Sequence, residues 1–149
     1  MKLDEIPQLE PKILREFIAN FWANFHQHKR FLTLSCCLER IKREQLWQQW
    51  GHKSLFAYCL NELHFPSGQA NAYISAYLRL KALGINSQEM ATLEREQTLL
   101  RVLKATKVAK DRKTVLALLQ LRDDDFRVAI RSCTKRFAWN RRWYFHSRG

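Results

Sequence analysis

Apolar side chains recur every three or four residues along most of this chain, and this period limits what the chain can fold into. Residues three and four apart share one face of an α-helix, whereas a half-buried strand alternates at every second residue. No alternating, β-branched stretch stands out, and helix breakers are scarce, with 4 glycines and 3 prolines in 149 residues. The sequence therefore predicts an all-α fold, a compact domain of several helices.

Two long helices are predicted at the start of the chain. The first begins at Pro11 and runs to about His26, and the second runs from about Lys29 to Trp50 and ends at Gly51. The apolar stripe of the first comprises Ile13, Leu14, Phe17, Ile18, Phe21, Trp22 and Phe25. The second should bury Phe31, Leu34, Leu38 and Ile41 and expose Glu39, Arg40, Lys42, Arg43 and Glu44.

A tight turn then separates two short helices between Ser54 and Gly84. Proline lacks an amide proton and restricts the residue before it, so Pro66 should end the first helix near His64. Ser67 is placed to cap the second helix, and Gly84 to stop it. Predicted buried residues are Leu55, Phe56, Cys59, Leu60 and Leu63 in the first, and Ala70, Ile74, Tyr77 and Leu78 in the second, with Lys81 at the edge. In a basic protein, such a pair can lay its second helix in the DNA major groove.

Shorter helices are predicted further along. Asn86 with Glu89 fits a capping box, which starts a helix that should end at about residue 93. The next helix is expected from Glu94 to Ala105, and Asp111 and Asp123 are expected to cap two more. The helical domain would then occupy residues 1–130, followed by a separate segment of residues 131–149.

The stretch LWQQWGHKSLFAYCLNELHFPSGQANAYISAYLRLKALGI, residues 46–85, carries a resemblance to a known family. An aromatic-glycine turn leads to a serine-aromatic-x-x-tyrosine helix, a turn and a small-residue helix. It resembles a helical module of bacterial and phage proteins that occurs alone or fused to HNH nuclease domains, and the resemblance spans roughly Phe31 to Ile130. It implies a DNA-binding helix-turn-helix. Where such modules often carry glycine this chain has His64, which can adopt a positive φ less comfortably.

The charge of the chain favours a polyanionic partner. Its 26 lysines and arginines against 14 acidic residues give a formal charge of +12. Nucleic acid is the default partner, and an anionic membrane is the competitor. The sequence contains no run of about eighteen apolar residues that could span a bilayer, and the N-terminus lacks the form of a signal peptide. We therefore expect a cytoplasmic protein without membrane insertion, in a bacterial nucleoid or a phage-infected cell.

The outward face of the second short helix is the first candidate binding surface. The predicted base-reading residues are Ser67, Gln69, Asn71, Ser75 and Arg79. Gln and Asn can bond N6 and N7 of adenine, and Arg can fork onto guanine. The small residues Gly68, Ala72 and Ala76 would permit close approach. The alternative is an ordinary polar face in contact with solvent.

Basic residues elsewhere are candidates for contacts with phosphate that do not depend on base sequence. Five of these basic residues form a row in which each is three positions from the next. This spacing keeps neighbouring charges close but shifts them gradually around a helix, so the row could follow a phosphate backbone for part of its length. The row comprises Arg101, Lys104, Lys107, Lys110 and Lys113, and Lys53, Lys81, Arg141 and Arg142 complete the predicted phosphate-binding set. The alternative is a solubilising surface.

The segment of residues 131–149 interleaves aromatic and basic residues and contains no acid. Aromatic rings can stack on unpaired bases while arginines hold phosphate. A membrane interface and docking on the protein's own helices are alternatives. For docking we expect Phe137 and Trp139 to be buried, with Arg141 and Arg142 left available.

Catalytic and metal chemistry have little support. His26 and His28 ahead of Cys36 and Cys37 match no usual zinc spacing, and acidic residues at 123–125 are ordinary at a helix start. Glycine-rich phosphate loops, a serine elbow, a HExxH helix and a His-Asn-His nuclease arrangement are all missing from the sequence. The cysteines are interpreted as reduced packing thiols. No cofactor or metal is expected.

These observations favour a non-enzymatic protein that binds double-stranded DNA as a transcriptional regulator or a DNA-organising protein. A homodimer is expected from geometry, since one short reading helix rarely supplies enough affinity. One alternative is a protein that binds single-stranded nucleic acid or RNA through residues 131–149. Another is a protein-interaction adaptor whose charge only keeps it soluble.

Overall fold

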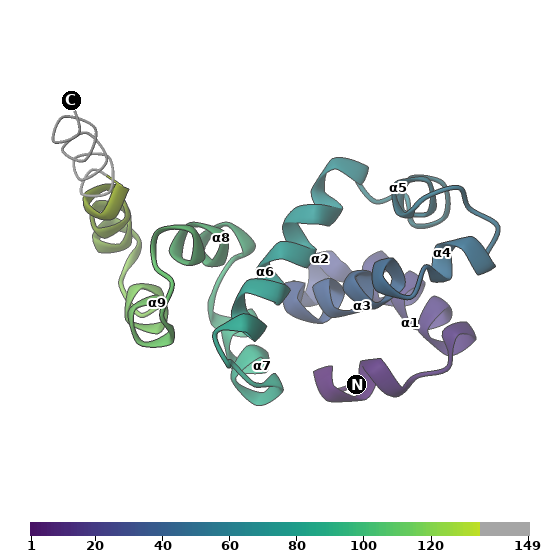
Figure 1. The fold of residues 1–149 in the computed structure, drawn as a ribbon, viewed down its shortest axis with the longest axis horizontal. Helices are drawn as coiled ribbons and strands as arrows, with labels where there is room; N and C mark the ends of the chain where they lie inside the picture. Colours follow the sequence, from purple (N-terminus) through teal and green to yellow (C-terminus); the bar gives the residue numbers. More distant parts are fainter. Residues whose placement is uncertain (135–149) are drawn as a thin grey trace, which may run out of the picture. The chain divides into compact units, whose positions relative to one another are not determined.

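Helix α3 (Phe31–Arg43) forms the centre of the first part of the molecule. The computed structural model describes residues 1–134, apart from the side chain of Ser67. All eight residues at 31–38 are buried, so neighbours surround the first two turns of α3 (Figure 1). Helix α6 (Ala70–Ala82) makes its most extensive contact, and α1 (Pro11–Ala23) and the 3-10 helix η1 (Leu3–Gln8) cover other sides.

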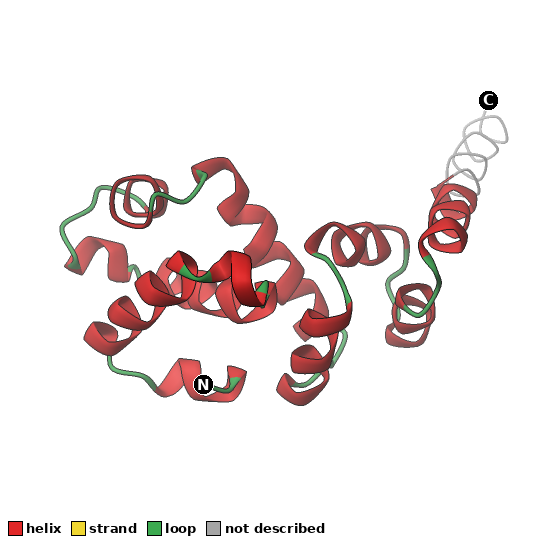
Figure 2. Ribbon diagram, turned by 180° about the vertical axis from the view of Figure 1, so that it is seen from behind, coloured by secondary structure: helices red, strands yellow, loops and turns green. Residues whose placement is uncertain are grey.

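The described residues form helices and loops without a β-strand, so the predicted all-α fold is confirmed (Figure 2). The chain divides into two compact units, Met1–Leu99 and Leu100–Gly149, whereas the sequence suggested one helical domain up to residue 130. The remaining elements are α2 (Phe25–His28), α4 (Leu46–Gln49), α5 (Leu55–Tyr58), η2 (Cys59–Leu63), η3 (Ser67–Gln69), α7 (Ser87–Glu96), α8 (Leu99–Val108) and α9 (Arg112–Leu119). A last helix covers residues 123–134 of the described chain.

Three predicted helices have the wrong bounds because the chain turns within or near them. The first helix stops at Ala23, and α2 follows it. The second breaks after α3, where Gln45 adopts a left-handed backbone with φ 53°. This turn carries Leu46 into the core, where it is buried. The third break lies between α7 and α8, inside the helix expected to start at Glu94.

Two charged residues of the first unit are buried because distant segments supply their partners. Arg40, expected to face solvent, donates from Nη1 to the carbonyl oxygen of Ile6 at 2.8 Å and from Nε to Glu44 at 2.9 Å. Glu94 of α7 accepts the backbone N–H of Thr33 at 2.9 Å and also its hydroxyl at 2.9 Å. Its carboxylate therefore caps the start of α3, which has no side-chain cap of its own.

Two of the predicted helix caps are confirmed, although the predicted ends of the long helices are wrong. The box of Asn86 and Glu89 is confirmed, since each side chain bonds the other residue's backbone N–H, at 2.8 and 3.2 Å. Asp111 caps α9 by accepting the N–H of Thr114 at 2.9 Å, as predicted. Asp123 is not a cap, because it already lies within the last helix, whose first turn includes a bond from Phe126 N–H to the Arg122 carbonyl at 2.7 Å.

Candidate nucleic-acid interface

The turn ahead of α6 is sharp because the preceding helix widens and then ends in a left-handed residue. Ser54 caps α5 by accepting the N–H of Ala57 at 3.0 Å, and α5 continues directly into the π-helical turn η2. His64 follows with φ 55° and ψ 36°, and the N–H of Phe65 reaches back to the Cys59 carbonyl at 2.8 Å. The predicted helix end near His64 is confirmed, and His64 itself has a positive φ.

Phe65 anchors this turn in the core of the first unit. It is fully buried, and its ring lies edge-on to Trp22 at 4.5 Å and to Tyr73 at 5.4 Å between centroids. Because Tyr73 belongs to α6 and Trp22 to α1, the contact holds the start of α6 against the N-terminal helices. The direction in which α6 leaves the turn is thus set by packing.

Helix α6 starts later than the sequence predicted. Its first residue is Ala70, and Gln69 occupies the N-cap position without a side-chain hydrogen bond. Ser67 lies in the 3-10 turn η3 ahead of it, and its side chain is outside the described part of the structure. Gly84 follows the helix with φ 78°, as expected of a residue that stops it.

The buried faces of both short helices differ in part from the prediction. Phe56, Leu60 and Leu78 are 42%, 57% and 44% exposed, and Lys81 is also exposed. Ala76, expected to ease approach to DNA, is fully buried. The residues of α6 that are buried are Ala70, Tyr73, Ile74, Ala76, Tyr77 and Leu80. The spacing of residues in the sequence did not fix the buried face of α6, because apolar side chains occur on several sides of this helix.

Three of the predicted base-reading residues share one outward face of α6. Asn71 and Arg79 are exposed and Ser75 is half-buried, and at 100° per residue all three project on the side opposite the buried stripe. Gln69 is exposed just ahead of the helix. Leu78 lies on the same face, an apolar member that the sequence assigned to the core.

One basic side chain contacts this face, and two other lysines of the first unit are exposed. The Nζ atom of Lys42, at the end of α3, donates to the Oδ1 atom of Asn71 at 3.4 Å. The Nζ atom of Lys81 lies 5.8 Å from the centre of the Tyr77 ring, and Lys53 is exposed just before α5. The sequence predicted only that Lys42 faces solvent. Its contact with Asn71 is visible only in the folded structure.

The described cysteines are free thiols, as predicted. Cys36, Cys37 and Cys59 are buried, and Cys133 is half-buried in the second unit. Burial raises the pKa of Cys36 to about 11 and that of Cys59 to about 11, so both thiols stay protonated at neutral pH.

The predicted row of cations in the second unit does not follow one helix. Lys104 and Lys107 are exposed on α8, whereas Lys113 is exposed on α9. Lys110 lies between these helices, and its Nζ atom donates to the carbonyl of Thr106 at 3.0 Å, at the end of α8. The row therefore bends with the chain and can follow a phosphate backbone only in part.

Arg101, predicted to bind phosphate, has an internal role. Its guanidinium donates to the Leu121 carbonyl at 2.6 Å and to Asp123 at 3.2 Å, and it lies 4.2 Å from the centre of the Phe126 ring. These contacts hold the start of the last helix against α8. The predicted Arg141 and Arg142, like Phe137 and Trp139, lie outside the described residues.

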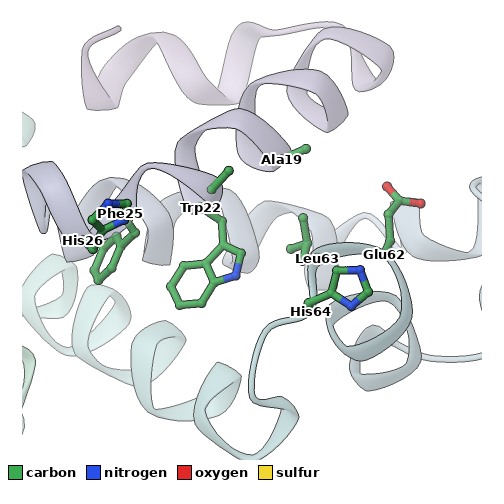
Figure 3. Close-up of a pocket in the computed structure, with 8 residues that line it drawn as sticks. Ala19, Trp22, Phe25, His26, Glu62, Leu63 and His64 are labelled. Carbon is green, nitrogen blue, oxygen red and sulfur yellow. The ribbon is translucent and has the colours of Figure 1, made fainter.

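A hollow of about 540 Å³ lies between the N-terminal helices and the turn that precedes α6. Figure 3 shows Trp22, Phe25 and His26 on one side of it and Glu62, Leu63 and His64 on the other. The Glu62 carboxylate accepts from Arg15 Nε at 2.8 Å and lies 3.1 Å from His52 Nε2. Glu62 therefore ties α1 and the loop after Gly51 to the turn.

Glu62 should make the stability of the first unit sensitive to acid. Hydrogen bonding to Arg15 holds the pKa of Glu62 below its usual value. A carboxyl whose pKa is lower in the folded state than in the unfolded state stabilises the fold at pH values above its unfolded-state pKa. This stabilisation is lost as the pH falls through its folded-state pKa. Glu62→Gln should therefore lower the free energy of unfolding by about 1 kcal/mol at neutral pH.

Urea unfolding of the wild type and Glu62→Gln, at neutral pH and at about pH 3, measures this difference. The difference should shrink at the acid pH, because protonation of Glu62 removes the charge that glutamine lacks. Glu16→Gln, at an exposed position of α1, is the matched control and should have little effect at either pH. A difference of the same size at both pH values would contradict the role of ionised Glu62.

In comparisons with known proteins, no family model, curated protein or solved structure matches this chain. Within residues 1–134, no group of three or more His, Cys, Asp or Glu side chains is placed to hold a metal ion. No helix in the described part of the chain combines the length and the apolar character needed to cross a bilayer.

Proposed function

We propose that this protein is a non-enzymatic, double-stranded DNA-binding protein that uses α5, the turn at His64 and α6 as a helix-turn-helix. In this proposal α6 enters the major groove, and its outward face contacts base edges. The observation that carries the proposal is the outward placement of Asn71, Ser75 and Arg79 on one side of α6, with Gln69 at its start. The task is transcriptional regulation or DNA organisation in a bacterium or phage.

The charge distribution supports the same proposal. Lys42, Lys53 and Lys81 lie on exposed parts of the first unit, and the whole chain carries +12. Lysines of this kind hold a phosphate backbone without regard to sequence, while the polar side chains of α6 supply discrimination. A homodimer, with paired half-sites, would double the base contacts of one short helix.

A salt-titrated comparison of partners tests this function. Duplex DNA, single-stranded DNA and a structured RNA are bound at several salt concentrations, and preferred duplex sequences are then selected from a random pool. We expect the duplex to bind most tightly and a recurring sequence to emerge. The logarithm of the duplex affinity should fall linearly against the logarithm of salt concentration. Failure to bind any nucleic acid at about 0.1 M salt would instead favour the protein-interaction adaptor.

A chain truncated after residue 137 separates the main proposal from the second candidate. Residues 131–149 interleave aromatic and basic side chains, which suits single-stranded nucleic acid. If α6 reads DNA, the truncated protein keeps duplex binding and sequence preference. Selective loss of single-strand or loop binding would assign that activity to residues 138–149, and circular dichroism checks that the truncated chain still folds.

A further inference from the structure

A second hollow, of about 320 Å³, opens beside the N-terminal end of α6. It lies within the first unit, where the end of α3, α4 and α5 meet the first turn of α6. Its apolar walls are Trp47, Leu55 and Phe56, and its polar rim is Lys42, Gln45, Ser54 and Asn71. Asn71 also belongs to the outward face of α6, so the hollow and the proposed reading surface are continuous.

The walls suit a flat ring. Leu55 is buried and Trp47 is half-buried, whereas the Phe56 ring is 42% exposed. An aromatic ring exposed to this degree beside an indole offers a surface on which a planar, unsaturated group can stack. Phe56 is exposed, whereas the other large apolar side chains of α5, Leu55 and Tyr58, are buried.

The rim offers hydrogen bonds to the edge of such a ring. Asn71 accepts from Lys42 through Oδ1, which leaves its Nδ2 amide to donate. The Ser54 oxygen accepts from Ala57, so its hydroxyl proton can also be donated. Gln45, whose backbone is left-handed with φ 53°, carries an exposed amide that both donates and accepts.

The charge of the rim selects the occupant. Lys42 is its charged residue, and none of the described residues that line the hollow is acidic. An apolar side chain from a protein partner could pack against the apolar walls of the hollow, but it would bring no negative charge to the ammonium group of Lys42. A nucleotide carries both a planar ring for the walls and a phosphate for Lys42.

We propose that the hollow accepts a single unstacked nucleobase of the bound nucleic acid, with its ring against Phe56 and Trp47 and its phosphate at Lys42. This inference rests on the proposed function, because the base would come from the DNA that α6 contacts. Stacking on one aromatic side chain is worth roughly tenfold in affinity. The protein should therefore prefer DNA with an unpaired base near its site.

The test compares a duplex that carries one bulged base with the same duplex fully paired. We expect the bulged probe to bind about tenfold more tightly. With 2-aminopurine as the bulged base, its fluorescence should fall on binding, because the base stacks on an aromatic ring. Phe56→Ala should abolish the preference and the fluorescence change, and binding of the paired duplex should stay within about twofold.

Two further variants sharpen the result. Leu60→Ala removes an exposed apolar side chain that does not line the hollow, so this matched control should keep the preference. Gln45→Gly preserves the left-handed backbone but removes the amide, and it should weaken the preference without disturbing Phe56. Circular dichroism checks the fold of each variant.

Equal binding of both duplexes by the wild type, or a preference that survives Phe56→Ala, would overturn the inference and leave the proposed function standing. Binding to neither duplex would overturn both together. The two failures are therefore distinguishable in one experiment.

Discussion

Replacing Glu94 with alanine is expected to lower the free energy of unfolding by about 3 kcal/mol. The buried carboxylate bonds the backbone N–H and the hydroxyl of Thr33, and it pairs with Arg30 Nε at 3.1 Å. Alanine would leave two buried donors without partners and a helix start without its cap. Urea denaturation followed by circular dichroism measures the change.

Two further sets of variants test whether the loss of stability comes from the hydrogen bonds of Glu94. Glu96→Ala, at an exposed position of the same helix, is the matched control and should change the stability by less than about 0.5 kcal/mol. Thr33→Val should cost much less in the Glu94→Ala background than in the wild type, since the shared hydrogen bond is already lost. Equal effects of Glu94→Ala and Glu96→Ala would show that Glu94 is no cap for α3.

The triple variant Gln69→Ala, Asn71→Ala, Arg79→Ala is expected to reduce discrimination between a selected DNA site and unrelated duplex by about a hundredfold. Each well-formed side-chain contact with a base edge supplies about 1–3 kcal/mol of discrimination. Weak binding that falls steeply with salt should remain, because the lysines that hold phosphate are unchanged. Competition binding of both duplexes at fixed salt measures the ratio.

The matched control uses the same residue types from other exposed positions of the first unit, namely Gln49→Ala, Asn61→Ala and Arg95→Ala together. It removes the same charge and similar surface area, so it should preserve discrimination. If the α6 variant discriminates as well as this control, α6 does not read the groove. A uniform loss of binding in both would point to charge alone.

Much of the fold could be predicted from sequence because the relevant signals act within one helical turn. The apolar spacing indicates helices, and the scarcity of glycine and proline leaves few other conformations. The caps at Asn86 and Asp111 depend on a side chain and a backbone N–H only three residues apart. The end at His64 depends on the restriction that Pro66 imposes on its neighbourhood.

The candidate site was predictable only in part, and the missing part follows from contacts between distant segments. The polar residues of α6 are visible in the sequence, but their neighbour Lys42 lies 29 positions before Asn71. The hollow beside them combines residues from four helices and loops, so no local pattern contains it. Leu78 and Phe56 look like core residues by spacing, and only the packed structure shows that they are exposed.

By itself the sequence determined that this chain is helical, where several helices begin and end, and that it carries a strong positive charge. Tertiary structure alone decided that Phe56, Leu60 and Leu78 stay exposed, and it placed Arg40 against Ile6 and Glu94 against Thr33. The physical reason is distance along the chain. A cap or a turn is decided by neighbours in the sequence, whereas burial depends on partners that the backbone brings together from 34 and 61 residues away.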